Sequence, residues 1–355
     1  MIWFLLAFLL LIVAITLLVL RGENLAHLDR DNVPNQGLTP GPGHNQVLET
    51  IRDMGRSARG LKGKARLMAL RKHMDGLSEG HDFVSEFRPS GANAPKGEWV
   101  LAPGVNTRRR ILYIHGGAWV AGSPRSHRTI TDRLSRLADA AVFAVDYRLL
   151  PEHRYREGLQ DCQEAYQWML DHGPDSAERA EFVVVAGDSA GGSHTLVLLA
   201  WVRDHGLRPA DAAIALSPST DLTLTAPSNR LNIKTDPLLG PTFGSLMRVP
   251  LPVLWWLSFF GMRLSPSSPL ASPLRGNLEN LPPTLIHASD SEMLLDNARR
   301  YANKAKDAGS PVELQTWPGM VHVWHIFPDL LPEAEEASDH IGEFLASIDR
   351  SQRAT

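Results

Sequence analysis

The chain has 355 residues, of which 43% are hydrophobic and 21% are charged, with a formal net charge of −3. This composition is typical of a globular protein rather than a disordered chain, and the weak charge gives no indication of a nucleic-acid partner. The single cysteine, Cys162, excludes an internal disulfide and a cysteine-based metal site.

Residues 1–20 form an uncharged, almost wholly apolar segment that ends at Arg21. About 20 apolar residues in a helix span the hydrocarbon core of a bilayer. The run is longer than the apolar part of a signal peptide, and it lacks both a basic leader and a small-x-small cleavage site. We therefore expect a single-pass membrane anchor, with a cleaved signal peptide as the alternative. Basic residues follow the segment and none precedes it, which favours a cytoplasmic catalytic domain.

Residues 21–45 are polar and rich in Asn, Pro and Gly, which predicts a linker, and a helical or cap region is expected at 46–95. From 96 to 355, short apolar runs alternate with amphipathic segments, as in an α/β catalytic domain. Strands are expected at 110–114, 141–147, 182–186, 212–216, 284–287 and 312–316. This alternation predicts a mostly parallel sheet that is covered by helices on both faces.

A Pro- and Ser-rich insertion at about 222–280 interrupts the alternation, and it contains an apolar run from Val249 to Met262. The run is too short for a second membrane span. We expect it to form a cap whose Trp255 and Trp256 line a substrate pocket together with Trp119. The alternatives are that the run dips into a membrane interface, or that it only packs within the fold.

Ser189 stands at the centre of Gly187-Asp188-Ser189-Ala190-Gly191, between an expected strand and an expected helix. Small neighbours permit the strained turn that projects a serine hydroxyl, and the helix that follows directs its N-terminal dipole toward developing negative charge. Ser189 is therefore the candidate nucleophile. The glycine spacing fits neither a dinucleotide site nor a phosphate-binding loop, so no nucleotide cofactor is expected.

Two further motifs follow strands. The glycines of His115-Gly116-Gly117 come directly after the first expected strand, and we expect the N–H groups of Gly116, Gly117 and Ala190 to stabilise an oxyanion. His322 follows the last expected strand, where a general base can reach the serine. The nearby His325 is not expected to act, and without a His-Glu-x-x-His pattern no metal is expected.

Together these motifs resemble the hormone-sensitive-lipase-like family of α/β-hydrolases, which is family IV among bacterial esterases. The similarity runs from about residue 98 to residue 345, and it includes the unchanged Gly187–Gly192 and the segment Asp146–His153. Ala118 stands where the family has a third glycine. The resemblance implies the α/β-hydrolase fold, a serine–acid–histidine order along the chain and ester substrates with short to medium acyl chains.

The acid of the implied triad is ambiguous in this sequence. The family's Asp-Pro-Leu-x-Asp is replaced by a segment that ends at Asp296, and the family spacing favours Glu292, with Asp290 as the alternative. Either carboxylate is able to orient a histidine and stabilise its imidazolium.

The resemblance thus implies a serine carboxylesterase that works through an acyl-enzyme and needs no cofactor. An acyltransferase or N-deacetylase with the same triad is the alternative, and a non-catalytic ligand-binding protein of the same fold is a third. The expected partners are a small-molecule or lipid-like ester and, through residues 1–20, a membrane. The sequence does not indicate an oligomeric state.

Overall fold

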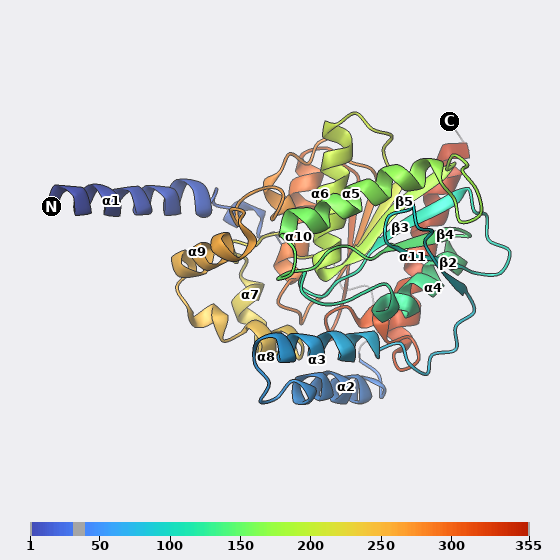
Figure 1. The fold of residues 1–355 in the computed structure, drawn as a ribbon, viewed down its shortest axis with the longest axis horizontal. Coiled ribbons are helices and arrows are strands. Elements are labelled where there is room, and N and C mark those ends of the chain that lie inside the picture. Colours follow the sequence, from blue (N-terminus) through green and yellow to red (C-terminus); the bar gives the residue numbers. More distant parts are fainter. Residues whose placement is uncertain (1, 31–39, 354–355) are drawn as a thin grey trace.

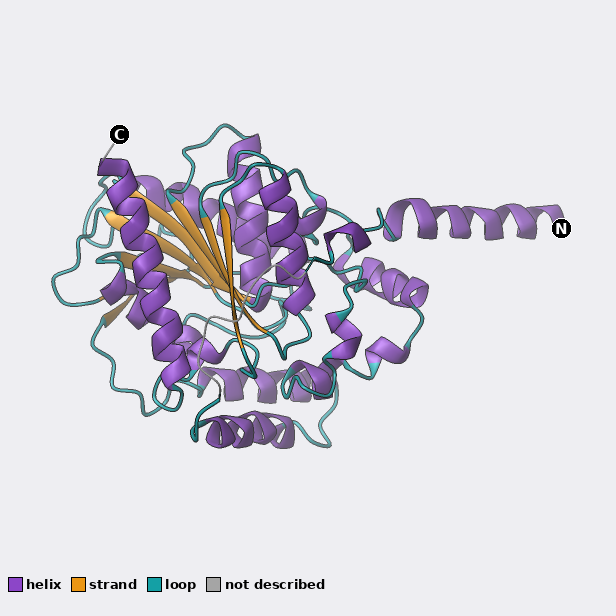
Figure 2. Ribbon diagram, turned by 180° about the vertical axis from the view of Figure 1, so that it is seen from behind, coloured by secondary structure: helices purple, strands orange, loops and turns teal. Residues whose placement is uncertain are grey.

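The structure is a computed structural model that describes residues 2–30 and 40–353. Residue 1, residues 354–355 and residues 31–39 of the expected linker lie outside the described residues. A central sheet lies between two layers of helices, and helix α1 (Ile2–Ile15), which η1 (Thr16–Leu20) continues, projects away from the rest (Figures 1 and 2).

Eight strands form one sheet in the order β1-β2-β4-β3-β5-β6-β7-β8. The strands from β3 onward pair in parallel, whereas β2 is antiparallel to both β1 and β4. This mostly parallel sheet confirms the expected fold class. The strands are β1 (Glu86–Pro89), β2 (Gly97–Leu101), β3 (Arg109–Ile114), β4 (Ala141–Val145), β5 (Phe182–Asp188), β6 (Ala212–Leu216), β7 (Thr284–Ser289) and β8 (Val312–Trp317).

The strands β1 and β2 were not expected, and β1 lies before residue 96, where the catalytic domain was predicted to begin. β1 is an edge strand that contains two charged residues and ends at Pro89, and none of its residues is fully buried. Edge strands of this kind lack the apolar alternation that reveals a strand in a sequence.

Each strand supplies side chains to both helical layers. In β5, Val183 and Val185 pack with α5, α6 and α10, whereas Val184 and Ala186 pack with α4 and α11. Burial on both faces explains why β5 is a continuous apolar run. These helices are α4 (Arg128–Leu137), α5 (Tyr155–Asp171), α6 (Ser189–Asp204), α10 (Leu295–Asp307) and α11 (Pro332–Arg353).

Two groups of smaller elements lie at the carboxyl end of the sheet. The helices α2 (His44–Ser57) and α3 (Gly63–Asp75) come from the N-terminal region. The insertion between β6 and β7 contains α7 (Ser228–Leu231), α8 (Leu239–Phe243) and α9 (Leu251–Met262). Short helical turns are η2 (Ala26–Leu28), η3 (Arg125–His127), η4 (Leu246–Arg248), η5 (Pro273–Arg275) and η6 (Trp324–Ile326).

Leu20, at the end of the apolar helix, and residues 21–30 after it pack against the catalytic domain. Leu20, Leu25 and Leu28 are each at most 2% exposed, and the last two belong to the main core beneath α5, α6 and α10. This part of the expected linker therefore packs against the catalytic domain. Its leucines are too widely spaced to stand out among polar neighbours, but they supply enough apolar surface to hold it in place.

Candidate active site

Ser189 occupies a sharp turn between β5 and α6. Its φ is +52°, a left-handed conformation that is strained for a serine. Glycines on both sides permit the turn, because a Cβ on Gly187 would lie 2.6 Å from the carbonyl oxygen of Ile114, and one on Gly191 would overlap the same atom. The close packing of this turn against β3 therefore requires both glycines of the Gly-x-Ser-x-Gly pattern.

The structure brings Ser189, His322 and Glu292 together in one hydrogen-bonded row. The Nε2 atom of His322 lies 2.9 Å from the Oγ atom of Ser189, and its Nδ1 atom lies 2.6 Å from Oε2 of Glu292. The three residues follow the carboxyl ends of β5, β8 and β7, respectively. Parallel strands present their carboxyl ends at one edge of the sheet, so residues more than 100 positions apart in the chain meet there.

The two candidate acids occupy different places. Glu292 is completely buried, and its Oε1 atom accepts the backbone N–H of Ser289 at 2.9 Å while Oε2 faces His322. The Oδ1 atom of Asp290 instead accepts the backbone N–H of Gly319 at 2.8 Å, in the loop that leads to His322. The geometry therefore gives the imidazole contact to Glu292 and a loop contact to Asp290.

Two opposing effects set the protonation of His322. Burial by itself lowers the pKa of the imidazole, but the hydrogen bond and the negative charge of Glu292 outweigh it, so the net pKa is raised above 6.5. In the neutral form, Nδ1–H donates to Glu292 and Nε2 is left to accept the Ser189 proton.

His325 lies away from the serine. Its Nε2 atom is 3.1 Å from Nδ1 of His287, and its ring packs against Trp324. Burial lowers the pKa of His325 to about 3, so this imidazole stays neutral. The structure therefore gives His322, and not His325, the contact with the serine.

The oxyanion loop differs from the expectation at Gly116. The Gly116 N–H donates to the Oδ1 atom of Asp188 at 3.0 Å, and the same carboxylate accepts the Tyr113 hydroxyl at 2.7 Å. The Gly116 amide is therefore occupied, and its prediction as an oxyanion donor is wrong. The glycine is needed for another reason, because a Cβ at this position would overlap the Asp188 carboxylate.

The free amides lie one residue further along. Gly117 and Ala118 both have positive φ values, of 113° and 53°, and they line the same cavity as Ser189 and Ala190. Among the described residues, no acceptor is found for the backbone N–H groups of Gly117, Ala118 or Ala190. The contact that occupies the Gly116 amide joins residues 72 positions apart, which local spacing does not reveal.

A cavity of about 530 Å³ opens above the serine and has mostly apolar walls. Trp119 lines it as expected. Further walls come from α2, α3 and the insertion, through Ile51, Leu70, Met74, Leu239 and Met247 among others. The contribution of α2 and α3 was not foreseen, because it depends on how these helices fold back over the sheet.

Trp255 and Trp256 are not among the residues that line this cavity, which corrects the expectation for the insertion. The Trp255 side chain is buried, and its Nε1–H donates to the Thr223 carbonyl at 2.8 Å. Trp256 points elsewhere and donates to the Oγ1 atom of Thr16 at 2.9 Å, next to the apolar N-terminal helix. Consecutive helical residues point about 100° apart, so the two rings take different neighbours.

A family model described as the alpha/beta hydrolase fold matches residues 111–326. The chain belongs to the α/β-hydrolase family. This α/β-hydrolase is 38% identical over 253 residues to the carboxylesterase/phospholipase LipF of Mycobacterium tuberculosis. The aligned region covers 69% of this chain and 65% of LipF, so the chain spans just under two thirds of the length of that relative. It is 37% identical over 248 residues to an acetyl-hydrolase of Streptomyces hygroscopicus, which covers 70% of this chain and 78% of that protein.

Solved structures agree with this assignment. EstE5, in a crystal soaked with p-nitrophenyl butyrate, superposes with a TM-score of 0.75 at 32% identity and covers 87% of this α/β-hydrolase and 99% of EstE5. An esterase from the bacterial hormone-sensitive lipase family gives a TM-score of 0.74 at 33% identity, with coverages of 87% and 98%. The expected resemblance to the hormone-sensitive-lipase-like esterases is confirmed.

Proposed function

We propose that this α/β-hydrolase is a serine carboxylesterase in which Ser189 is the nucleophile, His322 the general base and Glu292 the acid. The observation that carries this proposal is the unbroken row from the Ser189 hydroxyl through the imidazole to the Glu292 carboxylate, at the base of an apolar cavity. The names of the relatives, which include a carboxylesterase and an acetyl-hydrolase, support the same reaction.

The reaction follows from these contacts. Ser189 Oγ attacks the ester carbonyl while His322 Nε2 takes its proton, and the ionised Glu292 stabilises the resulting imidazolium. The N–H groups of Gly117, Ala118 and Ala190 receive the negative charge that develops on the carbonyl oxygen. His322 then protonates the leaving alcohol, and a water molecule, activated by the same imidazole, releases the acid from the acyl-enzyme.

The cavity bears on the choice of substrate. Pockets of about 300–1,000 Å³ take ligands of drug size, so this cavity is larger than an acetyl group requires. Its walls are mostly apolar, so burial of an alkyl chain there is favourable. We therefore assign esters of short to medium acyl chains, including lipid-like esters, as substrates.

The N-terminal helix supports a membrane anchor as part of this proposal. Among the described residues, Ile2–Leu20 is the one helix long and apolar enough to cross a membrane. Most of its side chains are exposed, and at 1.5 Å per residue its 19 residues reach about 28 Å. Arg21 at its end favours a catalytic domain on the cytoplasmic side. Protease added to sealed inside-out vesicles would then digest this domain, and right-side-out vesicles would protect it.

Hydrolysis of p-nitrophenyl butyrate tests the assigned nucleophile. Ser189→Ala is expected to lower kcat by about 10⁴- to 10⁶-fold, because the acyl-enzyme no longer forms. Ser193→Ala, one turn further along α6, serves as the matched control and is expected to retain activity. Undiminished turnover by Ser189→Ala would refute the proposal. Product analysis with competing alcohols distinguishes hydrolysis, which yields the free acid, from acyl transfer, which yields a new ester.

A further inference from the structure

Helix α9 presents an apolar face that no part of the described chain covers. Val253, Leu257 and Phe260 are 48%, 59% and 67% exposed, and their spacing of four and three residues places them on one side of the helix. The opposite side is anchored by the buried Leu254 and Trp255. Contiguous exposed apolar side chains of this kind mark a surface that contacts a membrane or another molecule.

The exposed face of α9 adjoins the point where the apolar N-terminal helix leaves the domain. Trp256 of α9 donates to the Thr16 hydroxyl at 2.9 Å. Just beyond α9, the hydroxyl groups of Ser265 and Ser267 both donate to the carbonyl oxygen of Val19, the first at 2.8 Å. α9 lies beside the base of the long helix, at the same end of the molecule (Figure 1).

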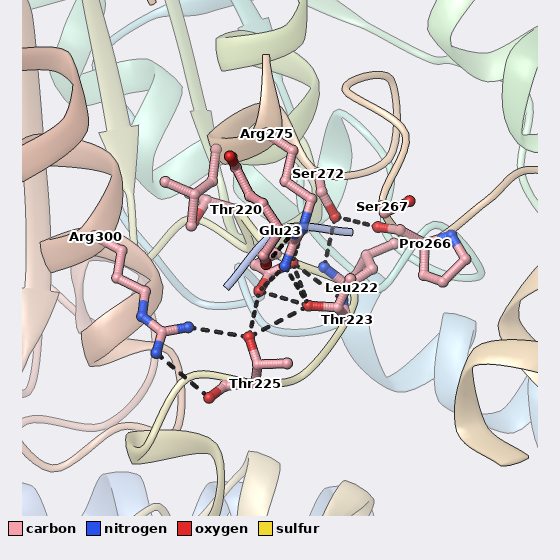
Figure 3. Close-up of polar contacts among 12 residues, drawn as sticks. Glu23, Thr220, Leu222, Thr223, Thr225, Pro266, Ser267, Ser272, Arg275 and Arg300 are labelled. Atoms are coloured by element: carbon pink, nitrogen blue, oxygen red, sulfur yellow. Dashed lines mark hydrogen bonds and ion pairs between the residues drawn. The ribbon is translucent and has the colours of Figure 1, made fainter. Parts of the chain in front are cut away.

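Polar contacts fix the chain after this base to the root of the insertion. Figure 3 shows Arg275 beside Glu23 and Thr223. The Arg275 guanidinium donates to the Glu23 carbonyl at 3.1 Å, and its Nε donates to the buried carboxylate of Asp221 at 2.9 Å. A buried ion pair of this kind is costly to break, so it fixes the segments that carry Arg275 and Asp221 relative to each other.

A second arginine makes a parallel link in the same region. Arg300 of α10 binds the Asp29 carboxylate at 2.6 Å. Its guanidinium also donates to the Thr225 hydroxyl at 3.1 Å (Figure 3). The segment after the helix is thus tied to the strand-end loop from which the insertion starts. The position of α9 relative to the N-terminal helix is therefore set by the fold.

We propose that the outer face of α9 inserts into the interface of the same bilayer that holds the N-terminal helix. This inference rests on the proposed membrane anchor. Once that helix crosses a bilayer, the fixed geometry brings α9 to the surface on the side of the catalytic domain. An apolar helical face with Leu and Phe side chains enters such an interface by about 5–10 Å.

The charges around α9 fit a lipid surface. Residues 249–262 contain no charged side chain, and Arg248 and Arg263 flank them on either side. Arginines at the ends of an apolar segment reach lipid headgroups while the segment itself enters the acyl region. Leu246 and Met247, which line the cavity, directly precede this segment. When α9 enters the membrane interface, one wall of the cavity therefore lies next to the membrane, where apolar esters accumulate.

Lipid quenching in the full-length protein tests this contact. Single cysteines replace Phe260 in α9, Leu9 in α1 and Val84, which precedes the edge strand β1 and is 51% exposed. Each is labelled with a small fluorophore in vesicles of phosphatidylcholine and phosphatidylglycerol that carry nitroxide-labelled lipid. The native Cys162 is fully buried and its thiol pKa is raised, so it does not take the label.

We expect several-fold quenching at the Phe260→Cys and Leu9→Cys positions and none at Val84→Cys. Quenching at Leu9→Cys without quenching at Phe260→Cys would overturn the insertion of α9 and leave the anchor intact. The absence of quenching at both positions would overturn the anchor together with the inference. Shielding of the Phe260→Cys label that depends on protein concentration in detergent, without quenching by lipid, would identify a second copy as the occupant and also overturn the inference.

Discussion

The His322 imidazole is buried between a hydroxyl group and a carboxylate, and its pKa decides the pH range of the reaction. Only the neutral imidazole accepts the Ser189 proton. Burial lowers the pKa, but the hydrogen bond and charge of Glu292, together with the charges of Asp236 and Asp188, outweigh this effect, so the net pKa is raised. Activity is therefore expected to fall as the pH drops through this raised pKa, and to be retained above it.

The pH profile of kcat/KM for Glu292→Gln tests this assignment. The substitution removes the charge that raises the His322 pKa and leaves the lowering effect of burial, so the acid limb is expected to move to lower pH. The amide also fails to hold the correct tautomer, so kcat is expected to fall by about 10⁴-fold. Asp290→Asn keeps the oxygen that accepts the Gly319 N–H. This variant is expected to preserve both the acid limb of the pH profile and kcat. The opposite pattern would make Asp290 the acid.

A second prediction at the residue scale concerns Gly116, in the loop that follows β3. A methyl group at Gly116 would overlap the Asp188 carboxylate and displace the amides of Gly117 and Ala118. Gly116→Ala is therefore expected to lower kcat by about 10²- to 10³-fold with little change in KM. Gly55→Ala, whose Cβ meets open space, is the control with unchanged kinetics. A Gly116→Ala protein that is folded by circular dichroism and fully active would contradict this role of the loop.

At the scale of elements, the segment after the N-terminal helix acts as part of the catalytic domain. Leu28→Ala removes a side chain that is 1% exposed and is expected to lower the free energy of unfolding by about 2–5 kcal/mol. Leu18→Ala, at a site that is 80% exposed, is expected to change it by less than about 0.5 kcal/mol. Urea unfolding in detergent, followed by tryptophan fluorescence, measures both. Equal stability of the two variants would show that this segment does not support the core.

The elements that the sequence predicted well carry strong local patterns. The strand that precedes Ser189 is a run of β-branched residues, and the amphipathic helices each have an apolar face. α9 is different because it is apolar all around, so its sequence does not say which side faces the cavity. Trp255 and Trp256 were therefore assigned to the pocket, whereas the fold turns one toward Thr223 and the other toward Thr16.

At the scale of the whole molecule, the cavity combines walls from α2, α3, the insertion between β6 and β7, and the carboxyl end of the sheet. Ser189 and His322 were predictable because each lies in a short motif next to a strand. The occupation of the Gly116 amide was not, because it depends on Asp188, which reaches Gly116 only in the folded chain. The cavity walls from α2 and α3 were hidden for the same reason.

This cavity predicts the dependence of the rate on acyl length. Each methylene that enters an apolar pocket gains about 0.8 kcal/mol, which corresponds to about fourfold in kcat/KM. We expect kcat/KM for p-nitrophenyl esters to rise from acetate through butyrate and to level off once the cavity is full. A steady fall from acetate onward would contradict the assignment of the cavity to the acyl chain.

Covalent labelling by a fluorophosphonate, located by peptide mass spectrometry, tests the central claim most directly. The reagent reacts only with a serine that a neighbouring base has activated. We predict a single adduct on the peptide that contains Ser189, formed much more slowly in His322→Gln. An adduct on another serine, or full esterase activity while Ser189 remains unmodified, would contradict the account.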